Sequence, residues 1–318
     1  MDGEISENNQ KSWDICFDRN RTYYLQVDED KVGTYLFDIN SQLVTSISLS
    51  PTAKKTTVGK TFTAAATVLP ANAYEKTIGW SSSDESIASV DQNGEIYTRK
   101  GGIAVITAAA KDGSGVTARL TVTVTPDALT GLGIASRKSS SIRLTWNSVY
   151  DVTGYKVYMY DAASKKYQLK KKTAKTAFTV KNLAAGTSYK FKVVPYVKNS
   201  YGTVNGKAGA VSSFTAPAKV KIKAAKKVSS RSEYDGKYIT RKLIWKKVPG
   251  AKGYFVYAST DGKNGYYSQL GRASKQGYKG YEQEYRKGTV VFFKVRAYLK
   301  SGGQQVLGAF SAPFKVKY

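Results

Sequence analysis

Histidine is absent from the 318 residues, and cysteine occurs once, as Cys16. Without histidine the chain cannot form the Ser-His or Cys-His pairs of nucleophilic enzymes, or a zinc site that needs imidazole. A single cysteine excludes an internal disulfide and a paired-cysteine site. The phosphate-binding and nucleophile motifs GxxxxGK-S/T, GxGxxG and GxSxG are absent too. We therefore expect no cofactor and predict that the chain is not an enzyme.

Long apolar runs are also lacking. No stretch approaches the ~18 apolar residues of a membrane span, and the acidic, polar start MDGEISENNQKSWD is unlike a signal peptide. The segment Leu69–Ala73, LPANA, departs from a wall-sorting motif and has no apolar tail after it. It is interpreted as a loop between strands.

Charge is unevenly distributed along the chain, whose net charge is +27. Residues 127–318 carry 38 lysines and arginines against 8 acidic residues, whereas residues 1–44 carry 4 against 9. A basic block of this size indicates an anionic partner, which could be nucleic acid, wall teichoic acid, an acidic glycan or anionic lipid.

Short runs of alternating apolar and polar residues fill most of the chain. ARLTVTVTP (118–126) alternates strictly and ends at proline, and GYKVYMYD (154–161) and KFKVVPYV (190–197) follow the same pattern. Such runs, separated by Gly, Asn, Asp and Ser, predict an all-β chain of consecutive β-sandwiches.

Part of the sequence is repeated. Trp146 and Trp245 are 99 residues apart, and each is followed by Gly-Tyr-x-Val-Tyr, at 154–158 and 253–257. A Gly-Ala-x-Ser segment also recurs 99 residues apart. The repeat predicts two homologous domains.

The segment NLAAGTSYKFKV in the first copy resembles the Leu-x-x-Gly-Thr-x-Tyr-x-Phe-x-Val segment of fibronectin type III domains, with Leu183 and a corner tyrosine at Tyr189. The second copy has Tyr285 and Val291 at these positions. Its corner hydrogen bond therefore cannot form, and we expect packing to replace it. The resemblance implies two fibronectin type III domains, at 127–217 and 218–318.

Residues 45–126, with WSSSDESIASVDQNGEI at 80–96, resemble the group 2 bacterial immunoglobulin-like domain. This family of small sandwiches occurs in bacterial surface proteins and phage virion proteins. The resemblance implies that Trp80 belongs to the core, as Trp146 and Trp245 do in their domains. It also implies that acidic side chains cap turns. These are Asp84, Glu85 and Asp91.

Residues 1–44 predict a strand pair, and FDRNRTYYLQVDEDKVGTYLFDIN resembles the end of a pre-peptidase C-terminal type β-sandwich. Two explanations stay open: the chain is cut from a longer protein, or the strand pair docks on its neighbour. Asp28, Glu29 and Asp30 could bind calcium, but a solvated turn is favoured and no metal site is predicted.

Two carboxylates, Glu282 and Glu284, share a strand-like segment. Paired carboxylates can hydrolyse glycosides. A solvated strand face beside Arg286 and Lys287 is the favoured interpretation, because small sandwiches rarely provide a cleft.

The candidate binding face follows from alternation, because every second residue of a strand points to the same side. Aromatic rings interleaved with cations can bind an anionic, ring-bearing polymer by stacking and charge. The predicted outward residues are Lys156, Tyr158, Tyr160, Lys190 and Lys192 in the first copy, with Phe255, Tyr257, Lys294 and Arg296 in the second.

A plainer interpretation of this face is favoured, since lysine on strands keeps sheets soluble and blunts their edges. A dedicated polyanion- or glycan-binding face stays open, because a single-sign surplus of this size exceeds what solubility needs. Other lysines are interpreted as general surface charge outside the face. These are Lys170, Lys171, Lys172 and Lys175.

The preferred function is a non-catalytic, modular, secreted or cell-surface bacterial protein or fragment that acts as a spacer, an adhesion element or a binder of anionic cell-wall polymer or glycan. A host surface protein is a further possible partner, nucleic-acid binding would be non-specific, and a monomer is expected. Short linkers at TPDALTG and FTAPAK predict a semi-rigid rod. The alternatives are a phage virion decoration or tail protein and an accessory region of a secreted enzyme.

Deletion of residues 1–44 should leave the three sandwiches folded, because each has its own core tryptophan. Thermal unfolding of the truncated chain, followed by circular dichroism, tests this. If the immunoglobulin-like domain unfolds, the removed strands complete its sheet and the boundary at 44 is wrong.

Overall fold

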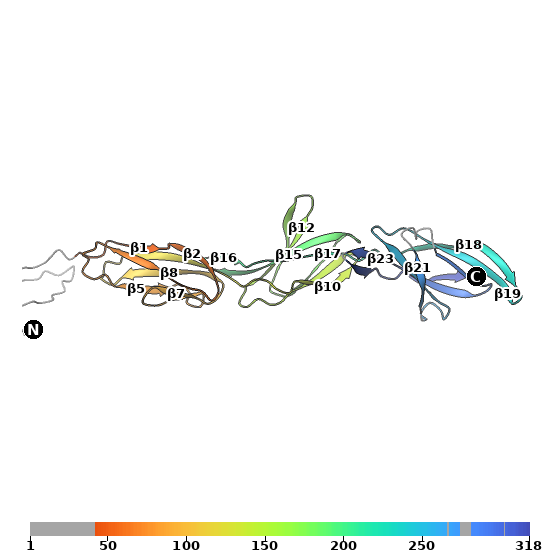
Figure 1. The fold of residues 1–318 in the computed structure, drawn as a ribbon, viewed down its shortest axis with the longest axis horizontal. Helices are drawn as coiled ribbons and strands as arrows, with labels where there is room; N and C mark the ends of the chain where they lie inside the picture. Colours follow the sequence, from red (N-terminus) through yellow and green to blue (C-terminus); the bar gives the residue numbers. More distant parts are fainter. Residues whose placement is uncertain (1–41, 266, 274–280, 302) are drawn as a thin grey trace, which may run out of the picture. The chain divides into compact units, whose positions relative to one another are not determined.

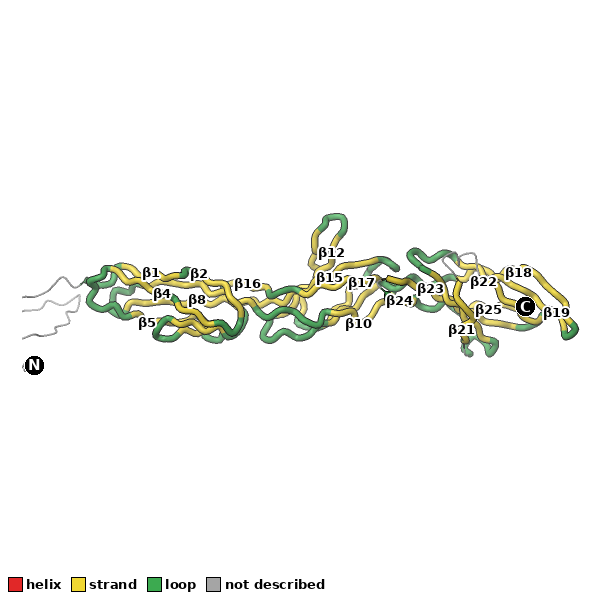
Figure 2. The backbone as a smooth tube through the Cα atoms, in the orientation of Figure 1, coloured by secondary structure: helices red, strands yellow, loops and turns green. Residues whose placement is uncertain are grey.

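A computed structural model describes residues 42–265, 267–273, 281–301 and 303–318. The regular elements in this part are β-strands, which confirms the all-β prediction, and Figure 2 shows strands joined by loops. No described helix is long and apolar enough to cross a membrane. Cys16 and the acidic turn at residues 28–30 lie outside the described residues. Residues 43–318 form one compact unit of the chain.

The first sandwich has a four-stranded sheet in the order β2-β9-β8-β5, a three-stranded sheet β3-β7-β6 and a β1-β4 pair (Figure 1). Strands β2 and β9 are parallel. The strands are β1 (Ser46–Ser50), β2 (Ala53–Thr57), β3 (Thr61–Thr63), β4 (Ala65–Leu69), β5 (Ile78–Ser82), β6 (Ala88–Val90), β7 (Glu95–Thr98), β8 (Gly102–Ala110) and β9 (Thr117–Thr125).

Alternation builds the core of this sandwich. In β8 every second residue from Gly102 to Ala108 is buried, and Ile106 meets Leu120 across the pair with β9. Trp80 on β5 packs against this core, as the family resemblance implied. The LPANA segment begins at the last residue of β4 and continues into the loop before β5, which confirms the loop interpretation.

The second and third sandwiches share one topology, a three-stranded sheet facing a five-stranded sheet. The second contains β10 (Gly133–Lys138), β11 (Ser141–Thr145), β12 (Gly154–Asp161), β13 (Lys166–Thr173), β14 (Ala177–Val180), β15 (Ser188–Asn199), β16 (Gly202–Asn205) and β17 (Gly209–Phe214). The third contains β18 (Ile222–Glu233), β19 (Gly236–Trp245), β20 (Gly253–Ser259), β21 (Ser268–Ala273), β22 (Tyr281–Arg286), β23 (Val290–Ser301), β24 (Gln304–Leu307) and β25 (Phe314–Lys317).

The repeated tryptophan and tyrosine form the same core contact in both copies. The rings of Trp146 and Tyr155 lie 5.4 Å apart, and those of Trp245 and Tyr254 lie 5.3 Å apart. Both tyrosine hydroxyls accept a hydrogen bond from a buried backbone N–H, over 2.8 and 2.9 Å. The tyrosines therefore anchor the loop that follows each tryptophan as well as the core.

The predicted difference at the tyrosine corner is confirmed. In the second sandwich the Ala184 N–H donates to the Tyr189 hydroxyl over 2.8 Å. In the third, Val291 offers no hydroxyl and is fully buried. Aromatic packing stands in its place, with the ring of Tyr285 4.8 Å from that of Tyr318.

The predicted boundaries at residues 44, 126 and 217 remain predictions. Val44 lies just outside the first of them, yet its side chain is buried and its N–H donates to an Asp112 carboxylate oxygen over 2.5 Å. A deletion that tests the independence of the immunoglobulin-like domain should therefore stop at residue 42.

Replacement of Tyr155 by Phe, or of Tyr254 by Phe, should lower the free energy of unfolding of its own sandwich by about 1–3 kcal/mol. The reason is that a buried backbone N–H loses its acceptor. Chemical denaturation of each variant measures the loss. Tyr150→Phe is the control, because Tyr150 is 83% exposed and its replacement should change stability by less than about 0.5 kcal/mol.

Candidate functional site

The lysines and tyrosines on the outer side of the β13-β12-β15 sheet lie on one surface, which we call the tyrosine–lysine face. In the register of the sheet Tyr158 lies opposite Lys192 on β15, and Lys156 lies opposite Lys172 on β13. Inward neighbours such as Val157 are fully buried. The face consists of Lys156, Tyr158, Tyr160, Tyr167, Lys172, Lys190, Lys192 and Tyr196.

The face continues onto the β12–β13 hairpin. Pairing of β12 with β15 ends at Met159 and Phe191, whereas pairing with β13 continues through Tyr160 and Tyr167. The hairpin therefore projects from the body of its sandwich, near the label β12 in Figure 1. Its two tyrosine rings meet edge to face, 5.4 Å apart.

Ammonium groups lie over the tyrosine rings. Lys192 Nζ is 5.1 Å from the ring centre of Tyr158 and 4.5 Å from that of Tyr167. Lys190 Nζ is 5.5 Å from the ring centre of Tyr160. These cation–π contacts, each about 0.5–1 kcal/mol at exposed sites, hold the charges in a fixed pattern on the sheet.

Lys156 is the most constrained lysine of the face. Its ammonium lies 4.9 Å from the Tyr196 ring centre and donates to Asn205 Oδ1 over 2.7 Å. Burial, followed by the charge of Lys172, lowers the pKa of Lys156. Lys172 lies opposite Lys156 on the neighbouring strand, so its positive charge acts on the Lys156 ammonium group.

Two residues of the face were missed by the sequence prediction, and one was assigned wrongly. Tyr167 and Tyr196 were not predicted, and Lys172 was interpreted as surface charge outside the face. A register shift between Val157 and Tyr158 leaves an extra residue, Lys170, on β13. This bulge changes which β13 side chains share the outer side.

No carboxylate of the described residues lies in an ion pair with the face. Among the described residues the ion pairs are Lys100 with Asp151, Arg231 with Glu233 and with Glu284, and Lys242 with Glu282. The positive charge of the face is therefore uncompensated by the described part of the chain.

The corresponding surface of the third sandwich is closed by its own side chains. Phe255 and Tyr257 lie on the outer side of β20, as predicted, but they are only 4% and 8% exposed. The guanidinium of Arg296 lies between the rings of Tyr257 and Phe310, at 5.1 and 4.5 Å, and donates to the Tyr257 hydroxyl over 2.6 Å. These residues stabilise the sandwich and are unsuited to an open binding surface.

Other cations of the third sandwich are also held by rings. Arg272 lies 5.0 Å from the ring centre of Phe255, which Tyr298 covers at 5.0 Å. Lys294 Nζ lies 3.7 Å from the ring centre of Tyr267. The two copies thus share a core and differ on the outer side.

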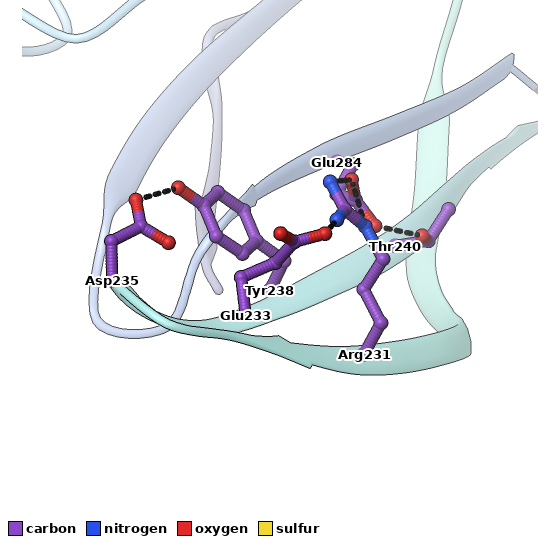
Figure 3. A network of polar contacts seen from close by, with 6 residues as sticks. All are labelled: Arg231, Glu233, Asp235, Tyr238, Thr240 and Glu284. Atoms are coloured by element: carbon purple, nitrogen blue, oxygen red, sulfur yellow. Dashed lines mark hydrogen bonds and ion pairs between the residues drawn. The ribbon is translucent and has the colours of Figure 1, made fainter.

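Of the two carboxylates considered for catalysis, Glu284 belongs to a charged network around Arg231, which Figure 3 shows. Glu284 accepts from the Arg231 guanidinium over 2.8 and 3.0 Å and from Thr240 over 3.1 Å. The Arg231 hydrogen bond lowers the pKa of Glu284, which suits a permanent anion rather than a general acid. Glu282 accepts from Lys242 over 2.8 Å. These contacts support the solvated strand face.

Turn capping in the first sandwich agrees with the family resemblance at Asp84 and Asp91, whereas the described residues show no capping hydrogen bond to Glu85. Asp84 accepts from the Ser86 N–H over 3.0 Å, and Asp91 accepts from the Asn93 and Glu95 N–H groups over 2.9 and 2.7 Å. Within the described ranges no group of His, Cys, Asp and Glu side chains could hold a metal ion.

Fold and surface together define a modular protein built from β-sandwich domains. Residues 43–122 match the family model of the bacterial Ig-like domain (group 2), and residues 127–208 match that of the fibronectin type III domain. The third sandwich repeats the topology of the second.

Three relatives match part of the chain. An uncharacterized protein of Clostridium acetobutylicum is 47% identical over 83 residues, which cover 26% of this chain and 9% of that protein. An Ig-like virion protein of Serratia phage KSP90 is 43% identical over 72 residues, or 22% of this chain and 28% of that protein. An alpha-L-arabinofuranosidase of Bifidobacterium longum is 51% identical over 61 residues, which cover 19% of this chain and 6% of that protein. The chain spans less than a third of each relative.

Similar solved structures include a two-domain fibronectin type III segment from chicken tenascin, which is 14% identical and has a TM-score of 0.32. The match covers 60% of this chain and 99% of the tenascin segment. The FN1–FN3 domains of chicken CNTN1 are 13% identical, with a TM-score of 0.37 and 86% of this chain covered against 98% of that one. Likeness at this level carries no argument about function.

Replacement of Lys172 by Gln should raise the pKa of Lys156, because removal of a like charge favours the protonated ammonium. NMR titration of the chain after reductive ¹³C-methylation of its lysines measures the pKa. Lys138→Gln, on the opposite sheet of the same sandwich, is the matched control and should leave Lys156 unchanged. An unchanged Lys156 in both variants would contradict the predicted coupling.

Proposed function

We propose that the chain is the non-catalytic, modular part of a secreted or cell-surface bacterial protein, and that its first fibronectin type III sandwich binds an anionic polymer. The tyrosine–lysine face carries this proposal, because its ammonium groups have no carboxylate partner among the described residues. The surplus of 38 basic over 8 acidic residues in 127–318 supports it further.

The proposed site is confined to one sandwich rather than spread over two. Phe255 and Tyr257 are buried, and Arg296 is stacked between rings, so the third sandwich lacks the accessible aromatic rings of the tyrosine–lysine face. It serves, together with the immunoglobulin-like domain, as a spacer that carries the face. We propose an extracellular or cell-surface location on the strength of the domain types.

A phage virion protein is the second candidate, because 72 residues of the chain are 43% identical to an Ig-like virion protein. The match to an arabinofuranosidase favours, in turn, an accessory region of a secreted enzyme. Neighbouring genes distinguish these assignments: tail genes support the virion protein, and a longer reading frame with a signal peptide supports a secreted one. A catalytic role for this chain would require turnover of a glycan that is lost in Glu282→Gln.

The double variant Lys190→Glu and Lys192→Glu should weaken binding of the whole chain to heparin, used as a model polyanion, by at least about tenfold at low salt. Wild-type affinity should fall steeply with salt, because bound counterions are released. A salt titration by biolayer interferometry measures both quantities.

The matched control is Lys138→Glu with Lys181→Glu, because both lysines are exposed and belong to or directly follow strands of the opposite sheet. It changes the net charge equally and should cost less than about threefold. Equal losses in the two variants would mean that general surface charge binds the polymer and would remove the proposed site.

A further inference from the structure

The rings of the tyrosine–lysine face are already in contact with cations. Lys192 lies over both Tyr158 and Tyr167, Lys190 lies over Tyr160, and the rings of Tyr160 and Tyr167 contact each other. A nucleobase or a sugar ring that stacks on a protein needs an open aromatic surface. A ligand that stacks on the same face of the ring would have to displace the ammonium group, so stacking on that face is disfavoured.

Apart from Leu169, which lies opposite Tyr158 and is 46% exposed, the groups of the face that remain for a ligand are polar. No hydrogen bond joins the hydroxyls of Tyr158, Tyr160 and Tyr167 to the described part of the chain, and Lys190 and Lys192 have no carboxylate partner there. Ammonium groups and phenol hydroxyls both donate hydrogen bonds. The face is therefore a set of donors with positive charge.

The spacing of the donors suits a flexible chain of anions. Lys190 and Lys192 are two residues apart on one strand, a Cα separation of about 6.6–6.8 Å. Lys156 and Lys172 continue the charge across neighbouring strands of the same sheet. A polymer whose backbone rotates freely can bring successive phosphates to such points, although ordering the polymer costs conformational entropy.

From these features we infer that the tyrosine–lysine face binds an acyclic phosphodiester polymer, of the poly(glycerol phosphate) type, through charge and hydroxyl donors and without ring stacking. The inference rests on the proposed function, that this face binds a polyanion. It adds the chemical class: phosphate diesters joined by a polyol without bases or sugar rings.

Binding of the whole chain to poly(glycerol phosphate), poly(dT) and heparin at equal charge concentration and salt tests the inference. We expect poly(glycerol phosphate) to bind at least as tightly per charge as the other two. Binding of poly(dT) about tenfold tighter than poly(glycerol phosphate) would show base stacking and overturn the inference. Binding of heparin about tenfold tighter than poly(glycerol phosphate) would overturn it too. In both cases the proposed function would survive, whereas failure of all three polymers to bind would remove it.

A second set of variants tests the role of the hydroxyls. Tyr158→Phe with Tyr167→Phe keeps both rings, and hence their contacts with Lys192, but removes two donors. It should weaken poly(glycerol phosphate) binding by about three- to tenfold and leave the salt dependence unchanged. Tyr150→Phe, which removes an exposed hydroxyl elsewhere, should have no effect. Unchanged affinity in the double variant would overturn the assigned role of the phenols.

Discussion

The contact between Trp146 and Tyr155 is the interaction on which the outer surface of the second sandwich depends. It buries the first inward residue of β12 after Gly154, and the Tyr155 hydroxyl holds the loop that leads into the strand. Because side chains alternate along a strand, the burial of Tyr155 and Val157 fixes Lys156 and Tyr158 on the other side. If the register of β12 shifted by one residue, Lys156 would be buried. The core therefore fixes the side of the sheet on which the charges of β12 lie.

The third sandwich shows that the same core leaves the outer side free to change. It keeps the tryptophan–tyrosine contact and the backbone hydrogen bond. Where the second sandwich has Lys156, however, the repeat places Phe255, which is buried under Tyr298 and Arg272. Phe255 and Tyr257 are buried in the third sandwich, whereas Tyr158, Tyr160 and Tyr167 are only half-buried in the second. The core contacts are therefore the same in the two domains, while the residues on the outer side differ.

Much of this arrangement could be predicted from the sequence. Strict alternation identifies the faces of β12 and β15, and the repeated segments locate the core tryptophans and the tyrosine corner. The contribution of β13 could not be predicted, because the bulge at Lys170 shifts its register and brings Tyr167 and Lys172 to the face. Nor does alternation reveal that Phe310, from a distant segment, covers Tyr257. Alternation tells on which side a residue lies, and packing across the sheet decides whether it is exposed.

The distribution of acidic residues bears on the two interpretations of the lysine surface, which are a device for solubility and a binding face for polyanions. On the β18-β19-β22 sheet, Glu282 and Glu284 lie opposite Lys242 and Thr240, and each is bonded to a basic side chain. Mixed signs of this kind are sufficient for a soluble sheet. Within the described residues the tyrosine–lysine face has no such ion pairs, and like charges on neighbouring strands destabilise a sheet. Burial and, after it, the charge of Lys172 lower the pKa of Lys156. In the function that we propose, a bound polyanion relieves the repulsion between these lysines.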